Sequence, residues 1–288
     1  MDLDDFKESS HVEDRRSSRG GFGGGVSMRS LFMLAPIIRM LLKTKFGWAI
    51  IGVGAFLYFS GFNPLSQAGG SSKVTADDEK KAVFIKKVLA TTEDIWGQIL
   101  PKYGIRYKKP NLVLYRGKTT SGCGFASAQM GPFYCPADQK VYLDLGFFDE
   151  LARRHNSPGD FAQAYVLAHE IGHHIQNMQG TLQKVQQVQQ RFGNSPKANA
   201  LQVRVELQAD CYSGVWAHHA QKRFRVLEPG DINEALRAAS SIGDDTLQKE
   251  AQGYVVPDSF THGSSQQRVE WFKRGFISGD LRSCNTFN

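Results

Sequence analysis

The hydrophobic and polar positions of this chain follow different patterns along its length, and the changes of pattern divide it into four regions. Residues 1–30 are polar and glycine-rich, offer little for a core to bury, and predict a disordered tail. Residues 31–62 are the most apolar part of the chain. Residues 63–75 contain a proline, serines and a glycine pair and predict a linker, whereas residues 76–288 have the mixed pattern of one globular domain.

The apolar stretch at residues 46–62 carries no charge, and as a helix it covers about 25 Å, close to the thickness of a hydrocarbon core. We interpret it as a single retained transmembrane helix. Residues 31–42 are interrupted by Pro36 and Arg39, which favours an interfacial or re-entrant approach to the membrane. The alternatives are a buried helix of a soluble domain, which the lack of a polar face disfavours, and a cleaved signal peptide, whose leader of about 45 residues is too long.

Charges beside this stretch predict its orientation. From Arg15 to Lys45 the chain carries only basic charges, whereas an acidic group at residues 77–79 follows on the other side. The positive-inside rule then places the tail in the cytoplasm and the domain in the periplasm or outside the cell. The expected location is the inner membrane, with one span.

Within residues 76–288, the spacing of apolar positions predicts an α+β domain that is mainly helical. An amphipathic helix with Asp77 as its cap is followed by a small antiparallel sheet, whose strands we expect at Leu112–Tyr115, Gly124–Ala128, Phe133–Tyr134 and Val141–Leu145. Three further helices are expected from Ser157–Pro158, after Pro196, and over about Ser264–Phe276. Glutamines between Gln176 and Gln190 predict a solvated helix face.

Composition narrows the class of protein. The 288 residues are 41% hydrophobic and 22% charged, which excludes a wholly disordered chain, a collagen-like repeat and a polytopic membrane protein. The net charge of +7 fits either an anionic membrane surface or nucleic acid. Because the basic run stands beside the apolar stretch, we interpret it as a topology signal and expect no nucleic-acid partner.

The helix that follows Ser157–Pro158 contains the pattern His169-Glu170-Ile-Gly-His173. Histidines at i and i+4 project from one helix face at the separation that grips a metal ion. Glu170 is rotated by about 100° from His169 and is placed to take a proton from a water on the metal. This pattern predicts a catalytic Zn²⁺ site with Glu170 as the general base; the alternative is a pair of surface histidines.

A zinc site of this kind needs a third ligand, and Glu206 is the best candidate. Glu206 and Asp210 lie at i and i+4 on a later helix, where Asp210 is suited to hydrogen bond the free ring nitrogen of a ligand histidine. Ala209 and Gly172 are small and permit close approach of the two helices. The weaker candidates for the third ligand are His174, His218 and His219.

A donor for the charge that develops on the substrate is predicted near the last helix. His262 precedes this helix, and Arg268 lies one and a half turns inside it. We expect His262 to stabilise the oxyanion and Arg268 to orient it. Capping of the helix is an equally good explanation of this segment.

Four cysteines allow three disulfide pairings, and the spacing does not decide among them. Cys123 and Cys135 flank a β-like run in a way that suits a bridge across a hairpin. Cys211 and Cys284 are suited to pin the C-terminal tail near the predicted site. Cysteine zinc ligands are the alternative, although the chain has no Cys-x-x-Cys motif. A disulfide requires an oxidising compartment, which agrees with the orientation expected from the charges.

Several motifs together resemble those of the neutral zinc metallopeptidases, a family of single-span bacterial envelope proteins; they are Val12–Arg16, Ser121–Phe125, Gly131–Pro136, Val141–Leu145, Ala168–His174, Glu206–Cys211 and Phe260–Ser265. More distantly, they are similar to membrane-associated gluzincins, which usually have proline at the position of Gly263. The resemblance implies a zincin-like fold. It also implies His169, His173 and Glu206 as ligands, Glu170 as the base and His262 as the oxyanion stabiliser.

These observations predict a membrane-anchored zinc endopeptidase that hydrolyses proteins or peptides in the cell envelope. The alternative is an envelope scaffold that contains the metal, has no proteolytic activity and binds protein partners.

Overall fold

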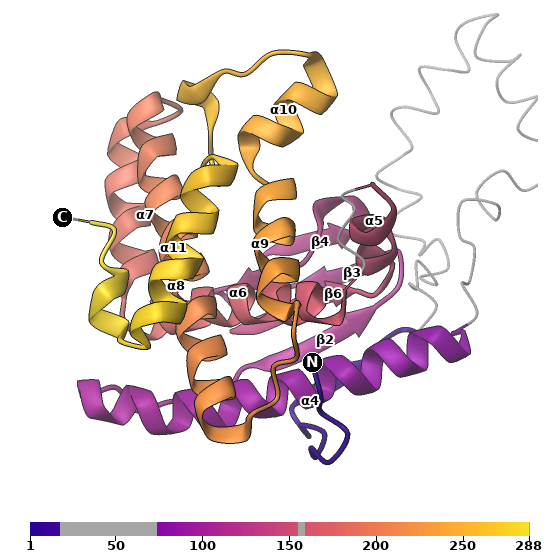
Figure 1. Ribbon diagram of the computed structural model, residues 1–288. Coiled ribbons are helices and arrows are strands. Elements are labelled where there is room, and N and C mark those ends of the chain that lie inside the picture. The colour runs from indigo at the N-terminus through magenta and orange to yellow at the C-terminus, as the bar shows by residue number, and fades with distance from the viewer. Residues whose placement is uncertain (18–73, 155–158, 288) are drawn as a thin grey trace, which may run out of the picture. The chain divides into compact units, whose positions relative to one another are not determined.

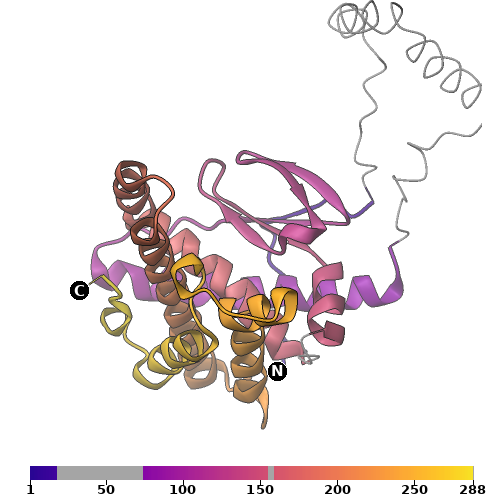
Figure 2. The ribbon, with the colours of Figure 1, turned by 90° about the horizontal axis from the view of Figure 1, so that it is seen from above.

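The computed structural model describes residues 1–17, 74–154 and 159–287, and within them residues 1–16 and the part from Val74 onward form one unit. The fold is α+β and mostly helical, as predicted. Its strands gather on one side and the C-terminal helices on the other (Figure 2). Helix α6 (Asp160–Met178) contacts both groups of elements, because it packs against β5 and β6 as well as against α8 and α9.

The main sheet has four strands in the order β1-β2-β6-β5, and these are Val12–Asp14, Asn111–Tyr115, Lys140–Asp144 and Phe133–Cys135. The prediction of an antiparallel sheet is wrong for most of it, because β1 pairs in parallel with β2, and β2 with β6. Parallel strands need a long connection, and the segment between β2 and β6 supplies one. That segment holds β5 and a separate antiparallel hairpin of β3 (Lys118–Ser121) and β4 (Gly124–Ser127).

Helix α4 (Ala76–Ile99) is the long helix at the bottom of Figure 1, and it contacts both α6 and α8. Its cap is Thr75, which forms a capping box with Asp78, rather than the predicted Asp77. The remaining helices of the described residues are α5 (Gly146–Arg154), α7 (Thr181–Phe192), α8 (Pro196–Phe224), α9 (Asp231–Ser241), α10 (Asp244–Gln252) and α11 (Ser265–Ser278). Short 3₁₀ turns occur at Leu100–Tyr103, Ala128–Met130, Pro257–Ser259 and Leu281–Cys284. The predicted start of α6 at Ser157–Pro158 lies outside the described residues.

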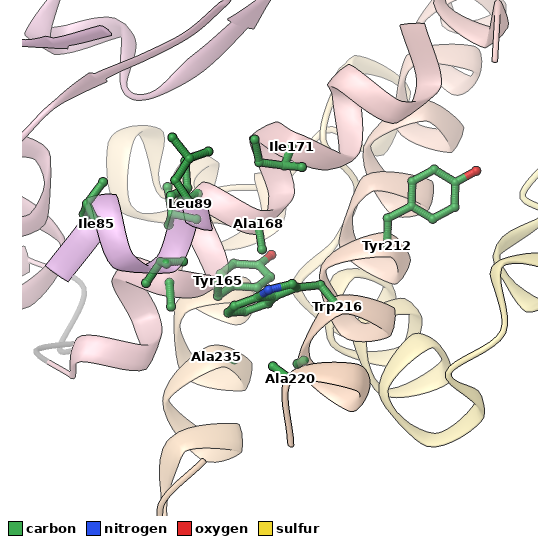
Figure 3. Packing of buried hydrophobic residues seen from close by; sticks show 14 of the residues in the cluster. Ile85, Leu89, Tyr165, Ala168, Ile171, Tyr212, Trp216, Ala220 and Ala235 are labelled. Carbon is green, nitrogen blue, oxygen red and sulfur yellow. The ribbon is translucent and has the colours of Figure 1, made fainter. Parts of the chain in front are cut away.

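The hydrophobic core lies where α4, α6 and α8 meet. Figure 3 shows Tyr165 and Ala168 of α6 facing Trp216 of α8, with Leu89 of α4 beside them. All four side chains are buried, and the indole Nε1 of Trp216 donates a hydrogen bond of 3.2 Å to Thr91 of α4. Burying side chains of this size contributes about 1.5–3 kcal/mol each, so this contact fixes α6 relative to α8.

The N-terminal residues differ most from the prediction. Residues 1–16 are not a disordered tail: Met1 and Leu3 are buried in the core, and β1 adds a strand to the edge of the sheet. The segment runs along α4 (Figure 1), and the backbone N–H of Ser9 donates to the carbonyl of Lys86. Residues 18–30 of the predicted tail lie outside the described residues.

Ion pairs explain how so polar a segment becomes ordered. The buried guanidinium of Arg16 lies 2.5 Å from Asp14 and 3.1 Å from Glu79, and it donates to the carbonyl of Asp78. Glu13 pairs with Lys140 of β6. Asp14 is a neighbour of Arg16 in sequence, whereas Glu79 and Lys140 are distant partners, which local composition does not reveal.

Within the described part of the chain, none of the helices has the length and apolar character needed to cross a bilayer. The predicted transmembrane helix at residues 46–62, the approach segment from residue 31 and most of the linker at 63–75 lie outside it.

The first prediction concerns Arg16, whose buried guanidinium pairs with the partly exposed carboxylates of Asp14 and Glu79. We expect Arg16→Gln to lower the free energy of unfolding by about 1–2 kcal/mol, because it removes the nearest cation from two carboxylates and a donor from a buried carbonyl. Urea denaturation of the purified chain measures the change. Arg282 provides a matched control, since it also pairs with an aspartate two residues earlier but is 81% exposed. Arg282→Gln should leave the urea midpoint unchanged, and equal shifts for both variants would contradict the role of Arg16.

The second prediction follows from the pairing of β1 with β2, which requires residues 1–16 and the domain to share one compartment. A single membrane crossing between them would separate the two paired strands, so a cytoplasmic N-terminus and an external domain do not agree with this sheet. We expect single cysteines at the exposed positions Ser10 and Lys249 to react alike with a membrane-impermeant maleimide on intact cells. Labelling of only one of them would show that the strands are separated.

Candidate metal centre

Three side chains from two helices converge on one point. His169 and His173 project from α6 and Glu206 from α8, and one ligand atom of each lies within 4.8 Å of the other two. The structure thus brings the two histidines of the sequence pattern to the carboxylate selected as their partner. The close approach depends on Gly172, because a Cβ there would lie 3.0 Å from the Cα and carbonyl oxygen of Ala209.

The spacing of these atoms fits a zinc ion. Ligand atoms at about 2.0–2.2 Å from a tetrahedral zinc lie about 3.3–3.6 Å from one another. The Oε2 atom of Glu206 lies 3.1 Å from Nε2 of His169 and 3.3 Å from Nε2 of His173. Two imidazoles and one carboxylate also form a donor set typical of catalytic zinc sites, which keep a further position for water or substrate.

The Nδ1 atom of His169 lies 2.9 Å from Asp210, whose side chain is fully buried. A carboxylate only accepts hydrogen bonds, so Nδ1 carries a proton, and Nε2 is the nitrogen left to bind a metal in place of its own proton. Arg268 of α11 donates two hydrogen bonds of 2.9 Å to Asp210, and the hydroxyl of Tyr165 donates a third. Sequence analysis identified Asp210 and Arg268 but missed Tyr165, which looks like an ordinary core aromatic.

The charges around this point favour a cation. Burial lowers the pKa of His169, but Asp210 and Glu206 outweigh it and raise that pKa to about 10. Burial raises the pKa of Asp210, but Arg268 and His169 outweigh it and lower that pKa to about 2. The two histidines likewise hold the pKa of Glu206 well below its usual range. Both acids are therefore ionised at neutral pH, and a positive charge between them is stabilised.

Two glutamines that the sequence did not single out contact the ligands. Gln202 donates a hydrogen bond of 2.8 Å to Oε1 of Glu206, which leaves Oε2 facing the histidines. Oε1 of Gln176 lies 2.8 Å from Nδ1 of His173. Gln176 was predicted to lie on a solvated face, but it is fully buried between α6 and α8. Only the packing of the two helices reveals this, because the same residue on an isolated helix would face water.

Glu170 borders the same centre and lines a cleft of about 1010 Å³ together with His169, His173 and Glu206. Glu170 is 7% exposed, and none of the described side chains hydrogen bonds to its carboxylate. It is therefore available to accept a proton from a water in the cleft. The lining of the cleft also includes apolar side chains from several elements, namely Met130, Phe133, Phe147, Val166, Leu182, Val185, Ile242 and Leu247.

His262 lines the same cleft, with 52% of its side chain exposed. Asp244 at the start of α10 holds it in place: one carboxylate oxygen accepts the backbone N–H groups of residues 261–263, and the other lies 3.1 Å from Nδ1 of His262. Ser264 caps α11, so His262 is free of that role. The expectation that Arg268 orients His262 is not met, because Arg268 contacts Asp210, and Asp244 is the partner that the sequence reasoning missed.

The weaker ligand candidates lie elsewhere. His218 and His219 hydrogen bond to backbone carbonyls of Phe276 and Gly279 at the end of α11. His174 faces away from the metal centre: its Nδ1 lies 3.0 Å from the hydroxyl of Tyr134, and its Nε2 lies 2.6 Å from the carbonyl of Lys108. It ties α6 to β5 and is not a ligand.

All four cysteines form disulfides, Cys123–Cys135 and Cys211–Cys284. In the chain-entropy description, loops of these lengths contribute roughly 3 and 4 kcal/mol. The second bond joins α8, one residue after Asp210, to the C-terminal turn. It therefore restrains the helix that carries Glu206.

Comparison with known proteins agrees with this picture. The model of the family described as "Putative neutral zinc metallopeptidase" matches residues 1–287, and the chain belongs to this family. It is 49% identical to the "Uncharacterized protein YpfJ" of Escherichia coli strain K12 over 282 residues, which cover 98% of this chain and 96% of YpfJ. It is 43% identical to the "Uncharacterized protein Rv2575" of Mycobacterium tuberculosis strain H37Rv over 215 residues, or 70% of each chain. No solved structure matches it.

The third prediction concerns the close contact of α6 with α8. Gly172→Ala places a methyl group against the backbone of Ala209, so we expect a loss of stability of about 1–3 kcal/mol and zinc binding weakened by about tenfold or more. Gly97→Ala in α4 is the control, because its new Cβ would meet only Tyr107, at 3.9 Å. That variant should gain about 0.5–1 kcal/mol from helix propensity. Urea denaturation and competition with a chelating dye measure the two quantities, and unchanged zinc affinity in Gly172→Ala would contradict the geometry.

Proposed function

We propose that this chain is a zinc-dependent endopeptidase, with a zincin-like centre formed by His169, His173 and Glu206. The observation that carries the proposal is the convergence of these three ligand atoms beside a buried, unpaired Glu170 in a cleft. Membership of the zinc metallopeptidase family supports the metal and the class of reaction.

The residues of the cleft have separable roles in peptide hydrolysis. Zinc, when bound, polarises the scissile carbonyl and lowers the pKa of the attacking water. Glu170 accepts a proton from that water and later donates it to the leaving amine. His262, held by Asp244, lies at the rim of the same cleft and donates a hydrogen bond to the oxyanion.

The sheet edge suggests how a peptide is aligned. In the described part of the chain, strand β4 pairs only with β3, and its residues 124–127 do not line the cleft, whereas Ala128 directly after it does. Strand β5 is the edge strand next to the cleft, which Phe133 and Tyr134 line. An extended peptide paired with β5 would pass the metal centre, and the apolar side chains that line the cleft would contact hydrophobic side chains of the substrate.

We also propose that the domain works outside the cytoplasm, at the cell envelope. Two disulfides support an oxidising compartment. The pairing of β1 with β2 supports the same compartment for the N-terminal residues. The proposed substrates are then envelope proteins or peptides. We further propose that the protein is attached to the inner membrane.

The fourth prediction tests the proposed function through Glu170. The purified oxidised chain should contain about one zinc per molecule and should cleave an unfolded test protein. Glu170→Gln should keep the zinc and slow cleavage by about 10²–10⁴-fold, because it removes the general base. Glu270→Gln, an exposed change on α11, is the matched control and should cleave at the wild-type rate.

Three outcomes would contradict this proposal. A chain without zinc would overturn the metal centre. Undiminished cleavage by Glu170→Gln would overturn the role of the base. A wild-type chain that binds zinc but cleaves neither the test protein nor any envelope protein trapped by Glu170→Gln would favour the inactive scaffold.

A further inference from the structure

We propose that Gln176 and Gln208 form an amide relay that fixes the ring of His173 for metal binding and links it to the Cys211–Cys284 disulfide. Gln176 and Gln208 are positioning residues that act through His173. The inference rests on the zinc centre of the proposed function and is independent of peptide hydrolysis.

The first link determines which ring nitrogen of His173 carries the proton. The side-chain nitrogen of Gln176 lies 2.7 Å from the backbone carbonyl of Val205, which only accepts hydrogen bonds. The amide oxygen of Gln176 must then face His173, 2.8 Å from Nδ1. An oxygen at this position requires a proton on Nδ1, and the lone pair of Nε2 is left for the metal.

The side-chain amide of Gln208 holds the side-chain amide of Gln176 in place. The side-chain nitrogen of Gln176 also lies 3.0 Å from Oε1 of Gln208, and Nε2 of Gln208 donates to the carbonyl of Cys284, again at 3.0 Å. The carbonyl of Cys284 fixes the orientation of Gln208 as that of Val205 fixes Gln176. Each hydrogen bond of the series therefore has its donor on the side of His173 and its acceptor on the side of the C-terminal turn.

The disulfide anchors the far end of this series. Cys284 is fully buried, and its bond to Cys211 holds the C-terminal turn against α8. Gln176 is fully buried and Gln208 is 7% exposed, so bulk water does not readily replace their hydrogen bonds. Without the bond, the turn that supplies the last acceptor would be attached to α8 only by noncovalent contacts.

The two ligand histidines are consequently supported in different ways. His169 has a charged partner in Asp210, whereas His173 has a neutral amide. A carboxylate stabilises the doubly protonated ring as well as the correct neutral form. A glutamine oxygen favours the Nδ1–H form without adding a charge, so it orients the ligand without a second buried anion.

The fifth prediction tests the relay by zinc affinity and by exchange of the ring proton, and needs no measurement of activity. We expect Gln176→Met, which keeps the volume and removes both polar atoms, to weaken zinc binding by about 10–100-fold. Gln208→Met should weaken it by a smaller factor. In the zinc-loaded protein, NMR should detect a slowly exchanging Nδ1 proton on His173, and Gln208→Met should speed its exchange.

The controls separate positioning from stability. Thr92→Val removes a buried hydrogen bond to Leu89 in α4, a helix that supplies none of the ligands, and should lower stability while leaving zinc affinity unchanged. Replacing Cys211 and Cys284 by alanine should weaken zinc binding at least as much as Gln208→Met does. Replacing Cys123 and Cys135 in the same way should leave the affinity within about twofold of the wild type.

The relay and the proposed function fail in distinguishable ways. A wild-type chain that binds no zinc would overturn the metal centre itself. Zinc binding of wild-type strength in Gln176→Met, or an equal loss in Thr92→Val, would overturn the relay alone. If the Nδ1 proton of His173 exchanges at the same rate in the wild type and in Gln208→Met, the hydrogen bond between Gln176 and Gln208 has no role in positioning His173.

Discussion

The fully buried carboxylate of Asp210 is the interaction on which the rest of the site depends. It accepts hydrogen bonds from His169 and Tyr165 of α6 and from Arg268 of α11, while it belongs to α8 itself. A buried charge without partners costs several kcal/mol, so these groups must stay together for the three helices to pack. Because they stay together, His169 has one orientation and Glu206, one turn before Asp210, has one position.

The contact between α6 and α8 has one part held by apolar packing and another held by the polar network of the ligands. The half nearer α4 contains Tyr165, Ala168 and Trp216, which are buried without needing any metal (Figure 3). The other half contains the ligands, whose direction the hydrogen bonds determine. A glycine also permits the close contact of α8 with α11: a Cβ at Gly214 would lie 2.1 Å from the carbonyl oxygen of Phe272. The scaffold thus places α11, and with it Arg268, close enough to neutralise Asp210.

The sequence predicts the parts of this site that local spacing determines. Residues at i and i+4 share a helix face whatever the fold, so His169 with His173, and Glu206 with Asp210, are recognisable as pairs. The partners that come from other elements are not: Asp244 approaches His262 from α10, and Gln176 resembles its exposed neighbours until α8 covers it. Strand β1 is a similar case. Its sequence is polar, and its order depends on pairing with β2 and on ion pairs of residues 13–16 with Lys140 and Glu79. Burial and pairing over long sequence distances decided these cases, and neither is visible in composition.

The difference between the two ligand histidines follows from the charge that the helix contact can hold. Arg268 neutralises Asp210, and Glu206 faces the two ligand histidines, so each of these two acids has its partner. A second carboxylate beside His173 would add another anion at a place where the backbone carbonyl of Val205 already lies 2.7 Å from the side chain of Gln176. None of the described cations contacts that position, and desolvation of an unmatched carboxylate would weaken the packing of α6 on α8. A glutamine supplies the acceptor that His173 needs and the donor that the carbonyl needs. The neutral amide is therefore the side chain that satisfies both groups at once.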